Sequence, residues 1–228
     1  MGDGSAATTP STSTLTRSPL AETELLVKSK QRVADHGEVF TPAWLVENML
    51  DLVGDETARI DSRVLEPACG SGNFLVPALL RKLKTAQARY GVNAFERNHN
   101  GLLALMCIYG VELLTDNADE CRNNLLETFC TFLAVSAESE YALAATHVLD
   151  VNIVEGDALT MKTNAGETIT FPEWGYLGKG KFQRRDFRFE DLRQRASYEG
   201  TLFGELAEQD LFLPLRSYPP MTVKELAQ

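Results

Sequence analysis

Three acidic residues stand at the ends of short apolar runs: Glu66, Glu112 and Asp157. Each run is short enough to be a buried strand of a parallel sheet. Open α/β sheets bind their ligands at the carboxyl ends of the strands. A carboxylate in that position can accept hydrogen bonds from both hydroxyls of a ribose. The three acids are therefore candidates to bind a ligand, although a lone acid after an apolar run is also common.

A turn with two glycines follows Glu66, and an apolar helix is expected after it. Gly70 and Gly72 let the backbone pass close to a bound molecule, because a Cβ at either position would fill the ligand's space. The amides near Asn73 would face an anionic or polar group. A dinucleotide fingerprint places its glycines first and its acid about 20 residues later. Here the acid comes first, which favours S-adenosylmethionine over NAD; an ordinary βα turn is the alternative.

A second stretch, Phe40-Thr41-Pro42, precedes the glycines by some 30 residues. We expect Thr41 to cap a helix that begins at Pro42. Its apolar face would be formed by Leu45, Val46, Met49, Leu50 and Val53. A capped amphipathic helix with no role in binding is the alternative.

From about Val33 to Met161 the sequence resembles the adenine-specific (N6) DNA methyltransferases, the M subunits of restriction-modification systems. Their first motif is similar to the stretch from Glu66 to Leu75. The resemblance implies an α/β, Rossmann-like class I S-adenosylmethionine-dependent methyltransferase domain. It also implies a set of cofactor-binding residues: Phe40, Thr41, Pro42, Glu66, Pro67, Ala68, Gly70, Gly72, Phe74, Glu112, Asp157 and Ala158.

The same resemblance implies a role for several of these residues. The Thr41 region would contact the methionine end of the cofactor, and Glu112 would hold the ribose diol. Asp157 would accept a hydrogen bond from the adenine amino group, with Ala158 and Leu159 lining the adenine slot.

The methyl-acceptor motif of such enzymes, Asn-Pro-Pro-Tyr, does not occur in the chain. The chemistry needs it, because oxygen atoms must take the hydrogens of the adenine amine while an aromatic ring stacks on the flipped base. The best positional substitute is Pro172, Glu173 and Trp174, with Trp174 as the stacking ring. Trp174 as a core residue is the alternative. Ser217–Met221 is expected to be a turn before a capping box at Thr222 and Glu225.

The segment Lys179–Arg195 holds seven basic and three acidic residues, with three phenylalanines between them. Basic residues with interleaved aromatics suit a nucleic-acid contact. The candidate contacts are Lys179, Lys181, Arg184, Arg185 and Arg188. A solvated hairpin, or a docking arm for an acidic partner, is the alternative.

The whole chain carries a net charge of −10. Phosphate contacts supply most of the affinity of a stand-alone DNA binder, so such proteins usually have a basic excess. If this chain acts on DNA, we therefore expect it to act with a second polypeptide. The four cysteines lack metal-ligand spacing and are expected to be reduced thiols, with no metal site. No apolar run is long enough for a membrane span and no signal region opens the chain, so we expect a cytoplasmic protein.

The composition predicts three segments. Residues 1–17 are rich in Gly, Ser, Thr and Ala and are expected to be a disordered tail. Residues 18–161 would form the cofactor-binding domain, beginning with a helix over 19–34. Residues 162–228 would be a basic and aromatic extension. Because only three strands are recognisable, the second half of the sheet is expected to be short or missing.

These features predict a methyltransferase, or the cofactor-binding subunit of one, that acts on adenine N6 in DNA. A non-catalytic scaffold or regulatory subunit that has kept the pocket and lost the acceptor site is the competing class. RNA, protein or a small molecule as substrate also stays open, because the cofactor half carries no information about the substrate.

Overall fold

The computed structural model describes residues 27–198 and 213–228 of the chain and divides it into two compact units, residues 1–39 and 40–228. The described part of the first unit contains helix α1 (Lys30–His36), which Ser29 caps by accepting a hydrogen bond from the amide of Arg32. The tail predicted over 1–17, and most of the helix predicted over 19–34, lie outside the described residues. What is described of that helix begins only at Lys30.

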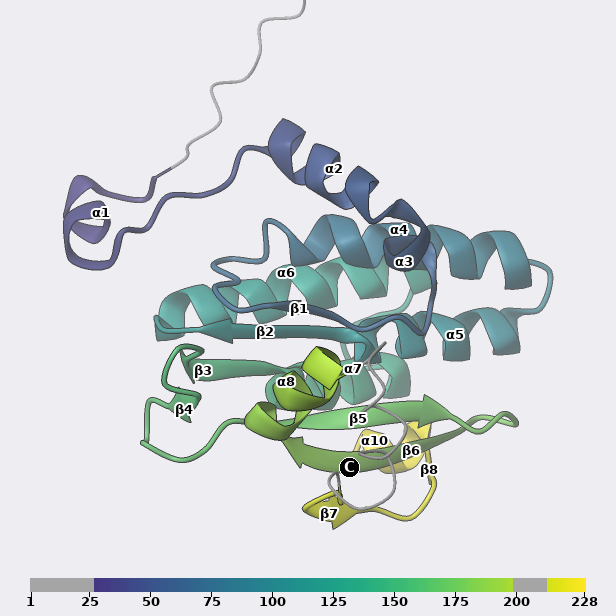
Figure 1. The fold of residues 1–228 in the computed structure, drawn as a ribbon. Helices are drawn as coiled ribbons and strands as arrows, with labels where there is room; N and C mark the ends of the chain where they lie inside the picture. The colour runs from purple at the N-terminus through teal and green to yellow at the C-terminus, as the bar shows by residue number, and fades with distance from the viewer. Residues whose placement is uncertain (1–26, 199–212) are drawn as a thin grey trace, which may run out of the picture. The chain divides into compact units, whose positions relative to one another are not determined.

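The second unit is built on a mainly parallel sheet, which confirms the α/β class (Figure 1). Its strands are β1 (Val64–Glu66), β2 (Ile108–Glu112), β3 (Ile153–Asp157) and β4 (Lys162–Thr163), in that order. β1, β2 and β3 are parallel neighbours, whereas β4 runs antiparallel to β3. All three strands predicted from the apolar runs are present.

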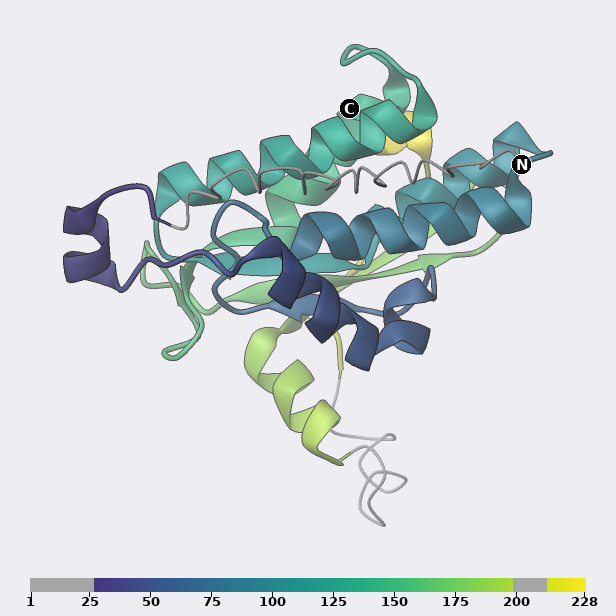
Figure 2. The same ribbon diagram turned by 90° about the horizontal axis from the view of Figure 1, so that it is seen from above.

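Two pairs of helices connect the parallel strands. Helices α4 (Leu75–Tyr90) and α5 (Ala94–Met106) lie between β1 and β2, and α6 (Thr115–Leu133) and α7 (Glu140–Asn152) lie between β2 and β3. α4 and α6 contact each other and run side by side behind the strands (Figure 2). Their apolar faces and β2 form the core, whose fully buried residues include Leu75, Leu79, Leu83, Ile108, Leu125 and Phe129.

Two helix caps differ from what the sequence predicts. Besides the cap at Thr41, the sequence predicts that Thr115 caps a long helix over about 116–133, with Cys121, Leu125, Leu126 and Phe129 on its buried face. Helix α2 (Ala43–Leu52) has Pro42 as its cap residue, with no side-chain cap, so the prediction that Thr41 caps it was wrong. The helix begins one residue later than expected, which puts Thr41 one position too early. Likewise α6 follows Leu114, and the hydroxyl of Thr115 donates to Glu155 Oε2 over 2.8 Å. A short helix, α3 (Gly54–Ala58), follows α2.

A second, antiparallel sheet follows β4. Strands β5 (Thr170–Tyr176) and β6 (Lys181–Arg188) form a hairpin, and two short strands, β7 (Arg216–Ser217) and β8 (Met221–Thr222), pair with β6. The residues proposed as a substitute acceptor site, Pro172 to Trp174, therefore lie inside a strand. The basic segment after Lys179 is a strand followed by helix α8 (Phe189–Tyr198).

The chain ends in helix α10 (Val223–Leu226). The Thr222 side chain accepts from the amide of Glu225, and Glu225 accepts from the amide of Thr222. The predicted capping box is confirmed.

Within the second unit, buried polar contacts hold the antiparallel sheet against the parallel sheet and its helices. The Tyr109 hydroxyl on β2 donates to the carbonyl of Pro172 over 2.8 Å, and its ring meets Phe171 edge to face. The indole Nε1 of Trp174 donates to Asn152 Oδ1 over 3.0 Å. The described residues of 162–228 lie in the same compact unit as the parallel sheet.

Candidate functional site

The turn from Cys69 to Gly72, here called the glycine loop, follows the carboxyl end of β1. Gly70 and Gly72 have φ angles of 52° and 93°, in the left-handed region that favours glycine. A Cβ at Gly70 would lie 3.3 Å from the Phe40 ring. The sequence therefore needs glycine at Gly70 for its backbone conformation and for the close approach of another segment.

Glu112, at the end of β2, is bonded directly to the glycine loop. Its Oε2 accepts from the amide of Gly70 over 2.8 Å, and its Oε1 accepts from the amide of Leu114 over 3.0 Å. The side chain is buried, with 7 % of the residue exposed. Each carboxylate oxygen can accept a further hydrogen bond. Glu112 thus joins the two strand ends and keeps acceptor capacity for a ligand.

Glu66, at the end of β1, is half-buried. Burial raises the pKa of its carboxyl, and a hydrogen bond from the backbone of Ala68 partly offsets this rise. Pro67 and Ala68, which follow, are exposed. The start of this loop therefore exposes part of the Glu66 carboxyl group, together with Pro67 and Ala68, to solvent.

The segment that contains Phe40, Thr41 and Pro42 does approach the glycine loop. The Phe40 ring is the nearest group to the position of a Gly70 Cβ. Thr41 is exposed and Pro42 is partly buried. Residues separated by some 30 positions in the sequence are thus brought together at the end of β1.

One protein family matches the part of the chain that contains most of these residues. Residues 23–129 match the N-6 DNA Methylase family model. Over this segment the chain resembles N-6 DNA methylases. The match covers a little under half of the chain and includes the Phe40 segment, the glycine loop and Glu112. The comparisons with curated proteins and with solved structures gave no match.

Asp157 lies beyond the methylase-like segment, at the end of β3. Its Oδ1 accepts from the amide of Leu159 over 2.8 Å, so the carboxylate shapes the turn that leaves the strand. Asp157 and Ala158 are partly buried and Leu159 is 93 % exposed. Glu112 and Asp157 stand at the same edge of the sheet, because β2 and β3 are parallel and adjacent.

Two residues of α6 that support the glycine loop were not among the predicted site residues. Asn124 Nδ2 donates to the carbonyl of Ser71 over 2.9 Å. Cys121 Sγ lies 3.1 Å from the position of a Gly72 Cβ. The hydrogen bond with Cys121, together with burial, raises the pKa of the Cys69 thiol well above its usual value. Cys121 was expected only as part of a buried helix face, and nothing in the spacing singled out Asn124.

The three residues considered as a substitute acceptor site are occupied by other contacts. Trp174 is 6 % exposed and hydrogen-bonded to Asn152, and Pro172 is buried with its carbonyl bonded to Tyr109. Glu173 pairs with Arg63 over 2.8 Å and with Arg185. In this conformation the Trp174 ring is a core residue of the hairpin and offers no open face to a base.

The five basic residues considered for nucleic acid do not form one surface. Successive strand residues point to opposite faces, so Lys181 and Arg185 lie on one face of β6 and Arg184 and Arg188 on the other. Arg184 is also mostly buried and donates to both oxygens of Asp186, over 2.7 and 3.0 Å. Lys179 is exposed in the turn before β6. The arrangement gives two small groups of basic residues.

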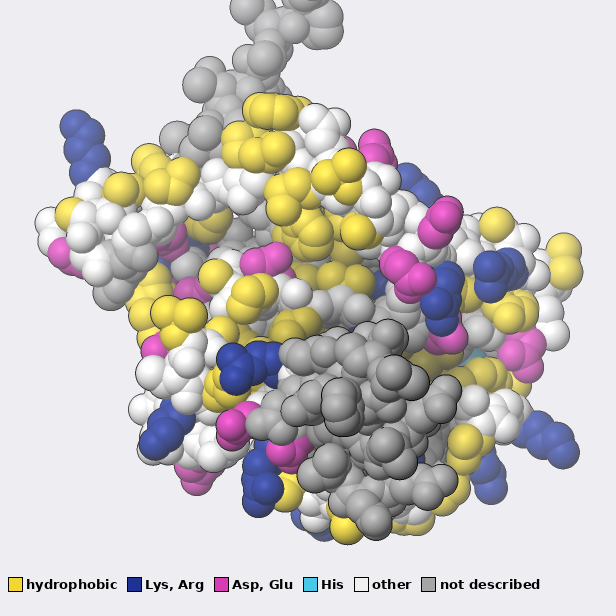
Figure 3. Space-filling view, viewed as in Figure 1, with side chains coloured by type: hydrophobic (Ala, Val, Ile, Leu, Met, Phe, Trp, Pro, Cys, Tyr) yellow, Lys and Arg dark blue, Asp and Glu magenta, His cyan; other side chains and the backbone are white. Residues whose placement is uncertain are grey.

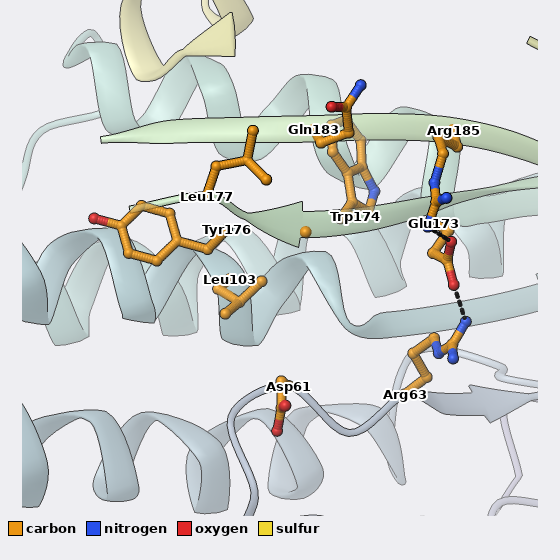
Figure 4. A pocket seen from close by; sticks show the side chains of 10 residues that line it. Asp61, Arg63, Leu103, Glu173, Trp174, Tyr176, Leu177, Gln183 and Arg185 are labelled. Carbon is orange, nitrogen blue, oxygen red and sulfur yellow. Dashed lines mark hydrogen bonds and ion pairs between the residues drawn. The ribbon is translucent and has the colours of Figure 1, made fainter. Parts of the chain in front are cut away.

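A cleft of about 710 Å³ lies between the amino-terminal side of β1 and the second sheet (Figure 4). Figure 4 shows Glu173 reaching across it to Arg63, with Arg185 beside them. Asp61 and Arg63 precede β1, whereas the glycine loop follows it. The cleft is therefore at the opposite end of β1 from the proposed cofactor residues. It is lined by Asp61, Arg63, Leu103, Glu173, Trp174, Gly175, Tyr176, Leu177, Gln183 and Arg185.

In the described parts of the chain, no group of three or more His, Cys, Asp or Glu side chains is arranged to hold a metal ion. The helices described there also include none with the length and apolar character that a membrane crossing requires.

Proposed function

We propose that the chain is the S-adenosylmethionine-binding part of a DNA adenine-N6 methyltransferase of the restriction-modification type. The observation that carries the proposal is the hydrogen bond from Gly70 to Glu112, which joins the glycine loop to the acid at the end of the next parallel strand. Ligands of open α/β sheets bind at this edge. The match of residues 23–129 to N-6 DNA methylases supports a methyltransferase role for it.

The residues present fit this cofactor. The loop at Gly70 is a cradle that a Cβ would obstruct, since the Phe40 ring lies 3.3 Å from that position. Glu112 retains acceptor capacity for the two ribose hydroxyls, and Asp157 would accept from the adenine amino group. Thr41 and Glu66 would lie near the methionine end. When bound, the cofactor supplies an electrophilic methyl group; the chain's own residues bind it, orient it and shield it from water.

We propose that a second polypeptide supplies the acceptor site. The amide of Val64 donates to the carbonyl of Cys107, the residue before β2, over 2.9 Å, so the amide of Val64 points toward β2. The amide and carbonyl of Leu65 therefore point away from β2, because neighbouring strand residues alternate. No strand in the described residues pairs with that side of β1. In doubly wound sheets the first strand is central and a strand of the second half lies beside it, which makes this edge suitable for an added parallel strand.

Apolar side chains near this edge support the same idea. Leu65 is 39 % exposed, and α2 carries three exposed apolar side chains, Trp44, Met49 and Leu52. Figure 3 shows hydrophobic side chains gathered over α2. Exposed apolar groups that cluster on one surface are typical of protein interfaces. Two half-exposed guanidinium groups, Arg63 and Arg185, lie beside the cleft and could meet acidic side chains of such a partner.

Calorimetry with S-adenosylmethionine tests the cofactor part of the proposal. The wild-type chain should bind without a partner, because every cofactor contact comes from this chain. Gly70→Leu should abolish binding through backbone strain and contact with Phe40. Gly166→Leu is the matched control, since Gly166 also has a positive φ, 84°, but has open space around it. If the wild type gives no binding heat, or if Gly70→Leu gives the same binding heat as the wild type, the proposed cofactor site is wrong.

A non-catalytic role for the same pocket is the second candidate. It is favoured by one observation, that the Trp174 ring is buried and hydrogen-bonded and no Asn-Pro-Pro-Tyr occurs in the chain. In that case the chain would bind the cofactor as a scaffold or regulatory subunit. Cofactor binding without methyl transfer in the presence of the second polypeptide would distinguish it.

A further inference from the structure

The glycine loop is held by hydrogen bonds from two sides. On the β2 side, the amide of Cys69 donates to the carbonyl of Val111 over 3.0 Å and that of Gly70 donates to Glu112. On the α6 side, Asn124 donates to the carbonyl of Ser71. Within the loop, the amide of Gly72 donates to the carbonyl of Cys69 over 2.8 Å. Each residue of the loop therefore has at least one backbone contact.

The contact from Asn124 fixes the orientation of a whole peptide unit. A peptide bond is planar, so holding the carbonyl of Ser71 also sets the direction of the amide of Gly72. That unit joins Ser71 to a glycine, which resists rotation less than any other residue type. Within the loop, the same unit is held by the hydrogen bond from the Gly72 amide to the carbonyl of Cys69. Asn124 adds a contact from outside the loop, whereas the Ser71 side chain bonds only locally, to Asn73 Oδ1 over 3.3 Å.

Cys121 limits the loop from beneath. Its Sγ lies 3.1 Å from the position of a Gly72 Cβ. Cys121 is fully buried and stands three residues before Asn124, on the same face of α6. Asn124 thus holds the carbonyl of Ser71, and Cys121 fills the space between the loop and α6, so that the loop cannot move closer to the helix.

We infer that Asn124, with Cys121 below it, is a positioning residue that keeps the glycine loop in the conformation that binds the cofactor. The inference rests on the proposed function for its ligand. If the loop samples other conformations, its apparent affinity falls by the fraction of molecules that remain competent. Loss of one neutral hydrogen bond corresponds to about a 2- to 10-fold change in that fraction.

The test compares three variants of the full chain by calorimetry with S-adenosylmethionine. Asn124→Asp keeps the shape but replaces the donor with a carboxylate, which repels the Ser71 carbonyl; binding should weaken roughly 10-fold or more. Asn124→Ala should weaken it about 2- to 10-fold. Asn123→Ala is the matched control, because the neighbouring Asn123 is exposed and faces a different groove, with Asp119 and Arg122. It should bind as the wild type does.

Hydrogen exchange of the cofactor-free protein provides a second measurement, which does not depend on the ligand. The amides of Gly70 and Gly72 should exchange faster in Asn124→Ala than in wild type, while the amides of β2 should not change. Equal exchange and equal affinity in Asn124→Ala and wild type would overturn the positioning role. If wild type does not bind at all, the proposed function fails, and the exchange data alone decide whether Asn124 holds the loop.

Discussion

At the scale of single residues, Glu112 connects two tasks that are usually described separately. Its carboxylate is bonded to the amides of Gly70 and Leu114, so it orders the glycine loop before any ligand arrives. The same group is the proposed acceptor for the ribose hydroxyls. A substitution there therefore changes both the shape of the loop and a contact with the cofactor.

Glu112→Gln should weaken binding of S-adenosylmethionine by about 1.5 to 3 kcal/mol, the range for hydrogen bonds to a charged group. The amide group offers one acceptor oxygen where the carboxylate offers two, and its NH₂ would face a backbone amide. Calorimetry gives the affinity. Glu127→Gln, on the exposed side of α6, is the control and should bind as the wild type does. Wild-type affinity in Glu112→Gln would make Glu112 an ordinary acid at a strand end.

Lys82 is a buried cation with a structural role. Its Nζ donates to the carbonyls of Arg59 and Ser62, over 2.6 and 2.5 Å, and to the Ser62 hydroxyl over 2.6 Å. It thereby ties α4 to the segment that leads into β1. Burial is the main cause that lowers the pKa of this amine to about 8. Between pH 8 and the unfolded pKa of about 10.4, the unfolded chain binds more protons at this site than the folded chain does.

The contribution of Lys82 to the free energy of unfolding should therefore rise as the pH increases from 8 to about 10.4, by up to about 3 kcal/mol. Burial raises the pKa of Cys107, to about 11, and that of Tyr109, and these shifts act in the opposite direction. The measurement is thus the difference in urea stability between wild type and Lys82→Met at several pH values. A difference that stays constant over this range would contradict the assignment.

At the scale of elements, the parallel strands and the capping box could be predicted from the sequence because their signals are local. A six-residue apolar run that ends in an acid specified β2, and Thr222 followed by Glu225 specified the capping box. The glycine loop was recognisable because backbone conformation restricts Gly70 and Gly72 directly. These features depend on a few adjacent residues and not on distant packing.

What could not be predicted depends on contacts between distant residues. Thr115 was expected to cap α6, but its hydroxyl donates to Glu155 on a neighbouring strand. Asn124 carries no local signal, because its partner Ser71 lies 53 positions away. The basic residues from Lys179 to Arg195 looked like one surface in the sequence, whereas the alternation of β6 divides those on that strand and Asp186 neutralises Arg184. Strand pairing and contacts between distant residues determine the partners of these side chains.

The hairpin β5–β6 provides a prediction about stability. Trp174→Phe removes the hydrogen bond to Asn152 and leaves a buried amide oxygen without that donor, which should cost about 1 to 3 kcal/mol of unfolding free energy. Urea denaturation followed by circular dichroism gives the value. Leu177→Ala, at an exposed position of the same hairpin, should change it by less than about 0.5 kcal/mol. If Trp174→Phe is as stable as the wild type, the hydrogen bond to Asn152 does not stabilise the fold, and the indole is again a candidate functional group.

At the scale of the whole molecule, charge and sheet order both bear on the proposal that a second polypeptide supplies the acceptor site. The net charge of −10 opposes binding to DNA, and the described basic side chains of β6 lie on two faces or in ion pairs. β1 presents one edge without a strand in the described residues. A partner that adds a strand there could bring both a basic surface and the acceptor site to the same edge of the sheet.

The chain alone should therefore transfer little or no methyl group to DNA, and transfer should appear when a polypeptide that carries Asn-Pro-Pro-Tyr is added. Positioning of the amine and stabilisation of developing charge contribute several kcal/mol each, so their absence should lower the rate by roughly a thousandfold or more. A tritium-transfer assay on adenine-rich duplexes measures this, with wild type, Trp174→Ala and a Lys179/Lys181 double alanine variant side by side. The lysines are preferable to Arg184 and Arg185, whose replacement would also break ion pairs inside the hairpin. Strong labelling by wild type alone, with loss in Trp174→Ala and normal folding of that variant, would contradict the two-chain proposal and place the acceptor site at Phe171–Trp174.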